Sequence, residues 1–221
     1  MTMSFPLETL TPANPDPSAS RTDKGVGCGH LVRHFRCIVA DPPWHYPHGY
    51  GRGPNGQLPY PTMTLGEIMA LPVSDLADQS AHLYLWTTSE HLRYAFSVIG
   101  AWGFAYRGTM VWCKPGLGMG GSYRTNHEII VIGERGKHEP RRRDVGTWHL
   151  WKNQRPHSSK PEEFYTLVES VSYGPYLELF ARRKRPGWSV WGNEVESDVC
   201  MPNGMDEGRR TQDSANTTGH L

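Results

Sequence analysis

Short apolar runs of β-type residues alternate along this chain with amphipathic helical patterns. Four runs are predicted strands, at residues 36–40, 81–86, 104–112 and 176–181. Two helical patterns lie among them, at residues 89–101 and 161–171. Alternation of this kind predicts the α/β class, in which a mostly parallel sheet is covered by helices.

A further apolar run, EIIVIG at residues 128–133, follows the Gly-rich segment 116–121. We expect this run to pair antiparallel with the strand that ends at Trp112. The Gly-rich segment formally matches G-x-G-x-x-G, which is typical of dinucleotide-binding turns. That fingerprint requires the glycines to open a helix, whereas a strand pattern follows here. We therefore interpret the segment as a loop at the rim of a site.

The length of 221 residues predicts a single domain with polar extensions. Residues 1–24 are rich in Pro, Ser and Thr, and residues 196–221 are polar without periodic apolar positions. We expect both to be disordered tails on either side of a domain at residues 25–195.

Composition excludes several classes of protein. The mean hydropathy is −0.58, and no apolar run is long enough for a transmembrane helix or a secretory signal. We therefore expect a soluble, cytoplasmic protein without a membrane partner. Four cysteines are too few for a disulfide framework in a chain of this size, which predicts reduced thiols. Cys28, His30, His34 and Cys37 could suggest zinc, but their spacing matches no structural zinc pattern closely, so no metal is expected.

The strongest local motif is the tetrapeptide that follows the first predicted strand. The run Cys37-Ile-Val-Ala leads directly into Asp41-Pro42-Pro43-Trp44, so a buried strand ends in a carboxylate, two prolines and an indole. Ligands bind at the carboxyl edge of an α/β sheet. Because proline fixes φ and lacks the backbone N–H, we expect a stiff turn whose carbonyls are free to accept hydrogen bonds. Asp41 and the Pro42 carbonyl then form a pair of acceptors beside the flat face of Trp44.

An aromatic amine such as that of adenine fits this arrangement. Its lone pair is delocalised into the ring, and two acceptors that hold its two N–H groups turn the lone pair toward an electrophile. If the electrophile is the methyl sulfonium of S-adenosylmethionine, no metal or covalent intermediate is needed and positioning is the main contribution. The alternative is a turn that merely ends a strand, with Trp44 as core packing. The order of strand, acid, paired prolines and aromatic favours the catalytic interpretation.

The DPPW tetrapeptide resembles the signature of the MT-A type adenine methyltransferases. That family includes the catalytic subunit of eukaryotic messenger-RNA N(6)-adenosine methylation and many small bacterial and phage proteins. The resemblance covers about residues 35–195. It continues, in the family's order, through YPTM (60–63), LYLWTT (83–88), VWCKPGLGMG (111–120), HSSKPEEFY (157–165), YLELFARR (176–183) and WGNE (191–194). It implies a circularly permuted Rossmann-like fold, with the catalytic motif ahead of the cofactor segment, and S-adenosylmethionine as methyl donor.

Lys160 stands just before the predicted helix that begins at Pro161. Proline suits a first helical turn and the two glutamates after it complement the helix dipole, whereas a lysine is unfavourable at the positive end. This position indicates that Lys160 has a ligand, the alternative being a solvated side chain. In the family the lysine of this motif lies at the methionine end of the cofactor, and the resemblance implies that role for Lys160.

Glu178 alternates with Leu177 and Leu179, so we expect it to face away from them near the sheet edge. An acidic group there commonly holds ribose hydroxyls in nucleotide-binding folds. The resemblance places Asn193 near the cofactor as well. The full set expected at the cofactor is Lys160, Glu178, Phe180, Asn193, Glu194 and Ile38. Residues 182–187, RRKRPG, depart from the best-known eukaryotic members, which leaves the ribose contacts in that loop open.

Basic residues cluster within the predicted domain. Residues 25–195 hold 19 basic and 14 acidic side chains, a net charge of +5, and the runs 141–143 and 182–185 lie close to aromatic residues. A basic face with stacking groups suits a polyanion that exposes its bases, although such runs are often only solvated surface. The residues expected to contact nucleic acid are Tyr46, Tyr60, Lys114, Arg124, Arg141, Arg142, Arg143, Arg155 and His157.

These features together predict an enzyme that methylates the 6-amino group of adenine in DNA, with the base rotated out of the helix onto Trp44. The same reaction on RNA, or a non-catalytic nucleic-acid-binding subunit of a methyltransferase complex, is the alternative. DNA is favoured because the chain is small and carries no added RNA-binding module. Sequence specificity is expected from loops 45–60, 114–126 and 141–157, or from a partner, which could be a second copy or a different subunit.

Overall fold

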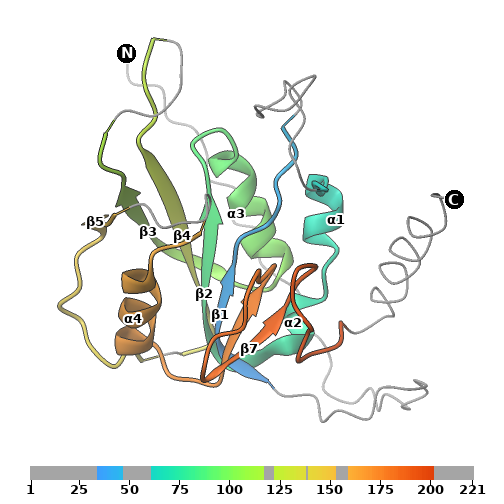
Figure 1. Ribbon diagram of the computed structural model, residues 1–221. Coiled ribbons are helices and arrows are strands. Elements are labelled where there is room, and N and C mark those ends of the chain that lie inside the picture. Colours follow the sequence, from blue (N-terminus) through green and yellow to red (C-terminus); the bar gives the residue numbers. More distant parts are fainter. Residues whose placement is uncertain (1–33, 47–60, 117–121, 138, 153–158, 202–221) are drawn as a thin grey trace, which may run out of the picture.

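A seven-stranded sheet forms the centre of the computed structural model, which describes residues 34–46, 61–116, 122–137, 139–152 and 159–201 (Figure 1). The strands are β1 (Phe35–Ala40), β2 (Ala77–Thr87), β3 (Ala105–Cys113), β4 (His127–Arg135), β5 (Trp148–Leu150), β6 (Tyr176–Leu179) and β7 (Trp188–Trp191). The helices are α1 (Leu65–Met69), α2 (Val73–Leu76), α3 (Leu92–Ala101) and α4 (Glu162–Val171). No helix in these ranges is long and apolar enough to cross a membrane.

The strand order is β5-β3-β4-β2-β1-β6-β7. β1 pairs in parallel with β2 and β6, β6 with β7, and β3 with β5. β4 runs antiparallel to both β2 and β3. The predicted mostly parallel sheet and its antiparallel strand beside β3 are therefore confirmed. Because β4 alone is reversed among the described strands, its first residues lie at the edge where the others end.

Helices cover both faces of the sheet, as Figure 1 shows. On β1, Ile38 and Ala40 pack into one apolar cluster together with residues of α1, α2 and α3. Cys37 and Val39 point the other way, into a second cluster that includes Phe164 and Val168 of α4. A strand that is buried on both faces reads as a continuous apolar run, which explains the sequence before Asp41.

The carboxyl end of β1 lies at a change in the direction in which the sheet is built. From β1 the chain passes through α1 and α2 to β2 on one side, and it later returns through α4 to β6 on the other side. Such a switch point leaves a crevice outside the strand ends, where ligands of α/β proteins bind. The strand that leads into DPPW also precedes the α4–β6–β7 segment, which is the order that the permuted fold implies.

Several element boundaries differ from the sequence predictions. The strand predicted at 176–181 ends at Leu179, because Phe180 adopts a left-handed backbone with φ of 62°. The helix predicted at 89–101 begins at Leu92, and β2 extends back to Ala77. The sequence predicts neither β5 nor β7, which are short strands of three and four residues without a clear apolar alternation.

The expected carboxyl boundary at residue 195 is also too early. The backbone N–H of Asp198 donates to the Val190 carbonyl at 2.8 Å, and the Asp198 carboxylate accepts from the Val190 N–H at 3.0 Å. Met201 is only 3% exposed and belongs to the main apolar cluster. Residues 196–201 therefore form part of the domain. The predicted tail at residues 1–24 lies outside the described residues, as do residues 202–221 of the tail predicted at 196–221.

Candidate active site

The DPPW turn leaves β1 at the switch point and closes on itself. The Pro42 carbonyl accepts a hydrogen bond from the Trp44 N–H at 2.8 Å, and the Pro43 carbonyl accepts from the Met63 N–H at 2.8 Å. The expectation that both carbonyls are free is therefore wrong, because the turn and the segment before α1 use them. A carbonyl oxygen has two lone pairs, so Pro42 retains the capacity for a second hydrogen bond.

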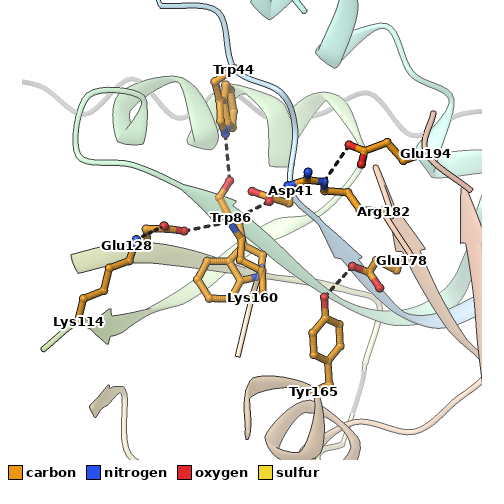
Figure 2. Close-up of polar contacts among 10 residues, drawn as sticks. All are labelled: Asp41, Trp44, Trp86, Lys114, Glu128, Lys160, Tyr165, Glu178, Arg182 and Glu194. Carbon is orange, nitrogen blue, oxygen red and sulfur yellow. Dashed lines mark hydrogen bonds and ion pairs between the residues drawn. The ribbon is translucent and has the colours of Figure 1, made fainter. Parts of the chain in front are cut away.

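Lys160, directly before α4, bridges two carboxylates at this edge. Its Nζ lies 2.8 Å from Asp41 Oδ2 and 3.0 Å from Glu128 Oε2, as Figure 2 shows. The Lys160 side chain is 10% exposed, and its ammonium lies 4.8 Å from the centre of the Trp86 ring. The alternative of a solvated lysine is therefore wrong, and its protein partners are carboxylates. The contact with a cofactor stays a prediction.

Glu128 is a site residue that the sequence analysis missed. It is the second residue of the antiparallel strand β4, so it lies at the edge where β1 and β2 end. It pairs with Lys114 as well as with Lys160, and the Lys114 ammonium lies 4.6 Å from the Trp112 ring centre. Its position in the sequence could have indicated this role, because Glu128 is an acidic residue at the start of the apolar run that is predicted to pair antiparallel.

Lys114, Glu128, Lys160 and Asp41 form a series of ion pairs with alternating charge. This series shifts the pKa values of Glu128, Lys160 and Asp41. Burial tends to raise the pKa of Glu128, but the ammonium groups of Lys160 and Lys114 outweigh it and lower that pKa to about 2. Burial tends to lower the pKa of Lys160, but Asp41 and Glu128 raise it above its ordinary value, so Lys160 stays charged. Desolvation raises the pKa of Asp41 against the pull of Lys160. The Asp41 side chain is nevertheless 37% exposed, so its carboxylate can be reached from the edge.

Trp44 is packed more tightly than the sequence indicated. Its side chain is 5% exposed, and its Nε1 donates to the Trp86 carbonyl at 3.1 Å. One face of the indole stacks on His91, with ring centres 5.4 Å apart and planes at 22°. His91, directly before α3, therefore covers one face of the indole, and the stacking of an adenine on Trp44 stays a prediction. Trp44 still lines a cavity of about 270 Å³, shared with His45, Met63, Thr64, Leu65, Glu90, His91, Arg93 and Tyr94.

Glu178 has the orientation that the strand pattern predicts. Leu177 and Leu179 are fully buried in the cluster with α1 to α3, whereas the Glu178 carboxylate accepts a hydrogen bond from the Tyr165 hydroxyl of α4 at 2.6 Å. Burial raises the pKa of Glu178. Tyr165 is a second residue that the sequence did not single out, and the role of Glu178 toward a ribose stays a prediction.

The remaining residues expected at the cofactor lie at the ends of β6 and β7, with one exception. Phe180 packs edge-on against Trp191, with ring centres 5.5 Å apart. Glu194 pairs with Arg182 at 2.8 Å, and Asn193 is exposed beside it. Ile38 is fully buried in mid-strand, because β1 is covered on both faces. Its place at the cofactor stays a prediction.

These residues fit S-adenosylmethionine by charge. The ends of the neighbouring strands β6 and β7 present Glu178 and Glu194, which suit the sulfonium and ammonium groups of that cofactor. Lys160 is the cation closest to Asp41 that can attract a carboxylate. Among the described residues no group of three or more His, Cys, Asp or Glu side chains is arranged to hold a metal ion, and Cys28 and His30 lie outside those residues.

Most of the cations expected to contact nucleic acid have carboxylate or carbonyl partners. Lys114 pairs with Glu128, and Arg142 makes two hydrogen bonds to Asp144 at 2.7 and 2.8 Å. Arg143 lies 3.8 Å from the Glu139 carboxylate, and the Arg141 guanidinium donates to the Glu169 carbonyl at 3.3 Å. Arg124 is exposed, and Tyr46 lies edge-on to His91. The expected residues Tyr60, Arg155 and His157 lie outside the described residues.

The second basic run, at 182–185, is paired with carboxylates within the fold. Each of its four cations pairs with a carboxylate: Arg182 with Glu194, Arg183 and Arg185 with Glu162, and Lys184 with Asp198. This run therefore ties β6 and β7 to α4 and to residues 196–201. Its contribution to a basic face is smaller than the sequence indicated.

Comparison with known proteins agrees with this geometry. The MT-A70 family profile matches residues 35–194. The type II methyltransferase M.MunI of Mycoplasma sp. is 27% identical over 186 residues, which cover 74% of this chain and 78% of the relative. The N(6)-adenosine-methyltransferase catalytic subunit METTL3 of Homo sapiens is 27% identical over 178 residues, 75% of this chain but 29% of the relative. A putative N(6)-adenosine-methyltransferase MT-A70-like protein of Medicago truncatula is 30% identical, covering 82% of this chain and 29% of the relative. Since the profile spans most of the sequence, the chain belongs to the MT-A70 family.

Proposed function

We propose that the protein transfers a methyl group from S-adenosylmethionine to the 6-amino group of adenine in DNA. The observation that carries the proposal is the position of Asp41, which directly follows β1 at the switch point and is held there by the buried ammonium of Lys160. The coarser conclusion, an adenine-specific N6-methyltransferase, follows from the family match and from the names of the relatives.

Two acceptors at the DPPW turn orient the 6-amino group of adenine. The Asp41 carboxylate and the second lone pair of the Pro42 carbonyl accept the two N–H groups, which directs the nitrogen lone pair away from both acceptors. S-adenosylmethionine supplies the electrophilic methyl group when it is bound. The proton that leaves the nitrogen already lies in the hydrogen bond to Asp41. The ammonium of Lys160 favours the ionised form of that carboxylate and fixes its position, so catalysis rests on positioning.

Support for DNA over RNA comes from the extent of the matches. The chain covers most of M.MunI, which is named a type II methyltransferase, whereas it covers less than a third of METTL3 and the plant relative, which are named N(6)-adenosine-methyltransferases. METTL3 is named a catalytic subunit, and a second subunit or a second copy of this chain would supply contacts beyond its own surface.

The test uses the purified chain with methyl-labelled S-adenosylmethionine and three substrates of matched sequence: duplex DNA, single-stranded DNA and RNA. After digestion to nucleosides, mass spectrometry should detect 6-methyl-2′-deoxyadenosine in DNA. Asp41→Asn is the matched control, because it preserves the size of the side chain and replaces one acceptor oxygen by a donor. Label in RNA alone would overturn the DNA assignment. Cofactor binding by calorimetry without methylation of any substrate would indicate a non-catalytic subunit.

A further inference from the structure

We propose that His91 is a positioning residue for methyl transfer, which holds the segment that leaves the DPPW turn. The inference rests on the proposed function, since it concerns the same site. His91 lies directly before α3, about fifty residues beyond Trp44 in sequence, and its side chain is 4% exposed. Its imidazole contacts three successive residues: Trp44, His45 and Tyr46.

The three contacts differ in kind and act together. The imidazole stacks on the Trp44 indole, as described above. Its Nε2 lies 2.9 Å from the His45 carbonyl oxygen, and the Tyr46 ring meets it edge-on with centres 4.4 Å apart. A stack restrains the tilt of the indole, and a hydrogen bond restrains the backbone one residue later. His91 alone therefore restrains both the Trp44 side chain and the His45 main chain.

The hydrogen-bond partners of His91 also orient its ring. A carbonyl oxygen only accepts, so Nε2 is the donor to His45. On the other side of the ring, Nδ1 lies 3.1 Å from the Thr88 hydroxyl, which donates to it when the imidazole is neutral. The imidazole is thus fixed between the end of β2 and the exit of the motif.

The position of His91 in the helix supports a role outside the helix itself. The residue before the first turn of a helix commonly caps it through a Ser, Thr, Asp or Asn side chain. At α3 the His91 carbonyl accepts the Tyr94 and Ala95 N–H groups at 2.9 and 3.1 Å, but its side chain makes no cap hydrogen bond. The side chain turns toward the DPPW segment instead.

These restraints reach the acceptor that the mechanism uses. The Trp44 N–H donates to the Pro42 carbonyl, and the Trp44 Nε1 donates to the Trp86 carbonyl. His91 stacks on the same indole, so its loss removes one of the restraints on Trp44 and weakens the hold on the Pro42 carbonyl. A displacement of about 1 Å in a positioning group can cost about 100-fold in rate.

The experiment compares His91→Ala, His91→Phe and His91→Gln with wild type. Alanine removes both restraints, phenylalanine keeps a ring for stacking, and glutamine keeps an N–H donor for the His45 carbonyl. We expect His91→Ala to lower kcat by about 10- to 100-fold, with the Kd for S-adenosylmethionine unchanged. The two conservative variants should each restore part of that loss. Methylation by wild type in the same assay tests the proposed function separately.

The matched control is His82→Gln, a buried histidine on β2 whose Nδ1 bonds the Ser172 hydroxyl at 2.7 Å, away from the turn. It should lower stability and leave kcat within about twofold. A second readout needs no activity: the Trp44 indole N–H, assigned by its loss in Trp44→Phe, should exchange with solvent at least about tenfold faster in His91→Ala. The proposal is overturned if kcat and indole exchange stay at wild-type values in His91→Ala, or if His82→Gln lowers kcat equally.

Discussion

Replacing Glu128 by glutamine should destabilise the protein by about 3 kcal/mol at neutral pH. The pKa of this carboxyl falls from 4.5 to about 2 because Lys160 and Lys114 flank it. One pKa unit corresponds to about 1.36 kcal/mol, so the shift is worth about 3 kcal/mol. The figure agrees with the cost of removing one partner from a buried ion pair, about 3 to 5 kcal/mol.

The sign of the pH dependence follows from the depressed pKa. The unfolded chain takes up a proton at about pH 4.5, whereas folded Glu128 resists protonation down to about pH 2. Its stabilisation is therefore complete above pH 4.5 and is lost as the pH falls toward 2. The difference between wild type and Glu128→Gln should shrink from about 3 kcal/mol at pH 7 to roughly 1 kcal/mol at pH 3.

Urea denaturation of both proteins at several pH values measures this difference. The matched control is Glu139→Gln, because the Glu139 carboxylate and its ion-pair partner Arg143 are both mostly exposed. An exposed pair contributes at most about 1 kcal/mol, so this variant should change stability little. The reasoning is refuted if Glu128→Gln costs no more than Glu139→Gln, or if its cost is the same at pH 3 as at pH 7.

Three further predictions concern the site and its surface. Asp41→Asn should reduce methyl transfer by about 10²- to 10⁴-fold while calorimetry shows nearly unchanged cofactor affinity; retention of more than about a tenth of turnover contradicts the assignment. Lys160→Ala should weaken S-adenosylmethionine binding by about 1.5 to 3 kcal/mol, and an unchanged Kd would remove Lys160 from the cofactor site. Replacing Arg141, Arg142 and Arg143 by alanine should weaken DNA binding for all sequences alike and make the salt dependence shallower by up to about 0.9 per lost phosphate contact; the same salt slope, or an altered choice of adenine, would contradict this.

The sequence predicted the fold well where apolar residues form long or regularly spaced runs. The apolar run before Asp41 predicted a buried strand, and the apolar run at 128–133 after glycines predicted the antiparallel strand β4. The short strands β5 and β7 escaped prediction because three or four residues carry no measurable period. β6 ends early because Phe180 adopts a left-handed backbone conformation, which the sequence does not indicate for an aromatic residue.

The sequence predicted only part of the functional site. Chain order indicates which residues end a strand, so Asp41 and Glu178 could be placed at the sheet edge. It does not indicate which side chains neutralise one another across the sheet. Glu128 reaches Lys160 only because β4 is reversed, and His91 reaches Trp44 only because α3 packs beside the turn. The run 182–185 looked basic because its carboxylate partners lie on α4 and after β7.

The carboxyl boundary of the domain gives a last prediction. A chain that ends after Met201 keeps the Asp198 carboxylate, which accepts from the Val190 N–H at 3.0 Å and pairs with Lys184 at 2.9 Å, and it keeps the buried Met201 side chain. A chain that ends after Val195 loses all of these contacts.

Burial of a methionine contributes about 1.5 to 3 kcal/mol and a hydrogen bond about 1 kcal/mol, so the shorter chain should be less stable by roughly 2 to 4 kcal/mol. Urea denaturation of the two truncated chains measures this difference. Met201→Ala and Asp198→Asn in the full chain divide it between packing and polar contacts. If the chain ending at Val195 is as stable as the one ending at Met201, residues 196–201 contact the domain without stabilising it. The domain boundary predicted at residue 195 would then be correct.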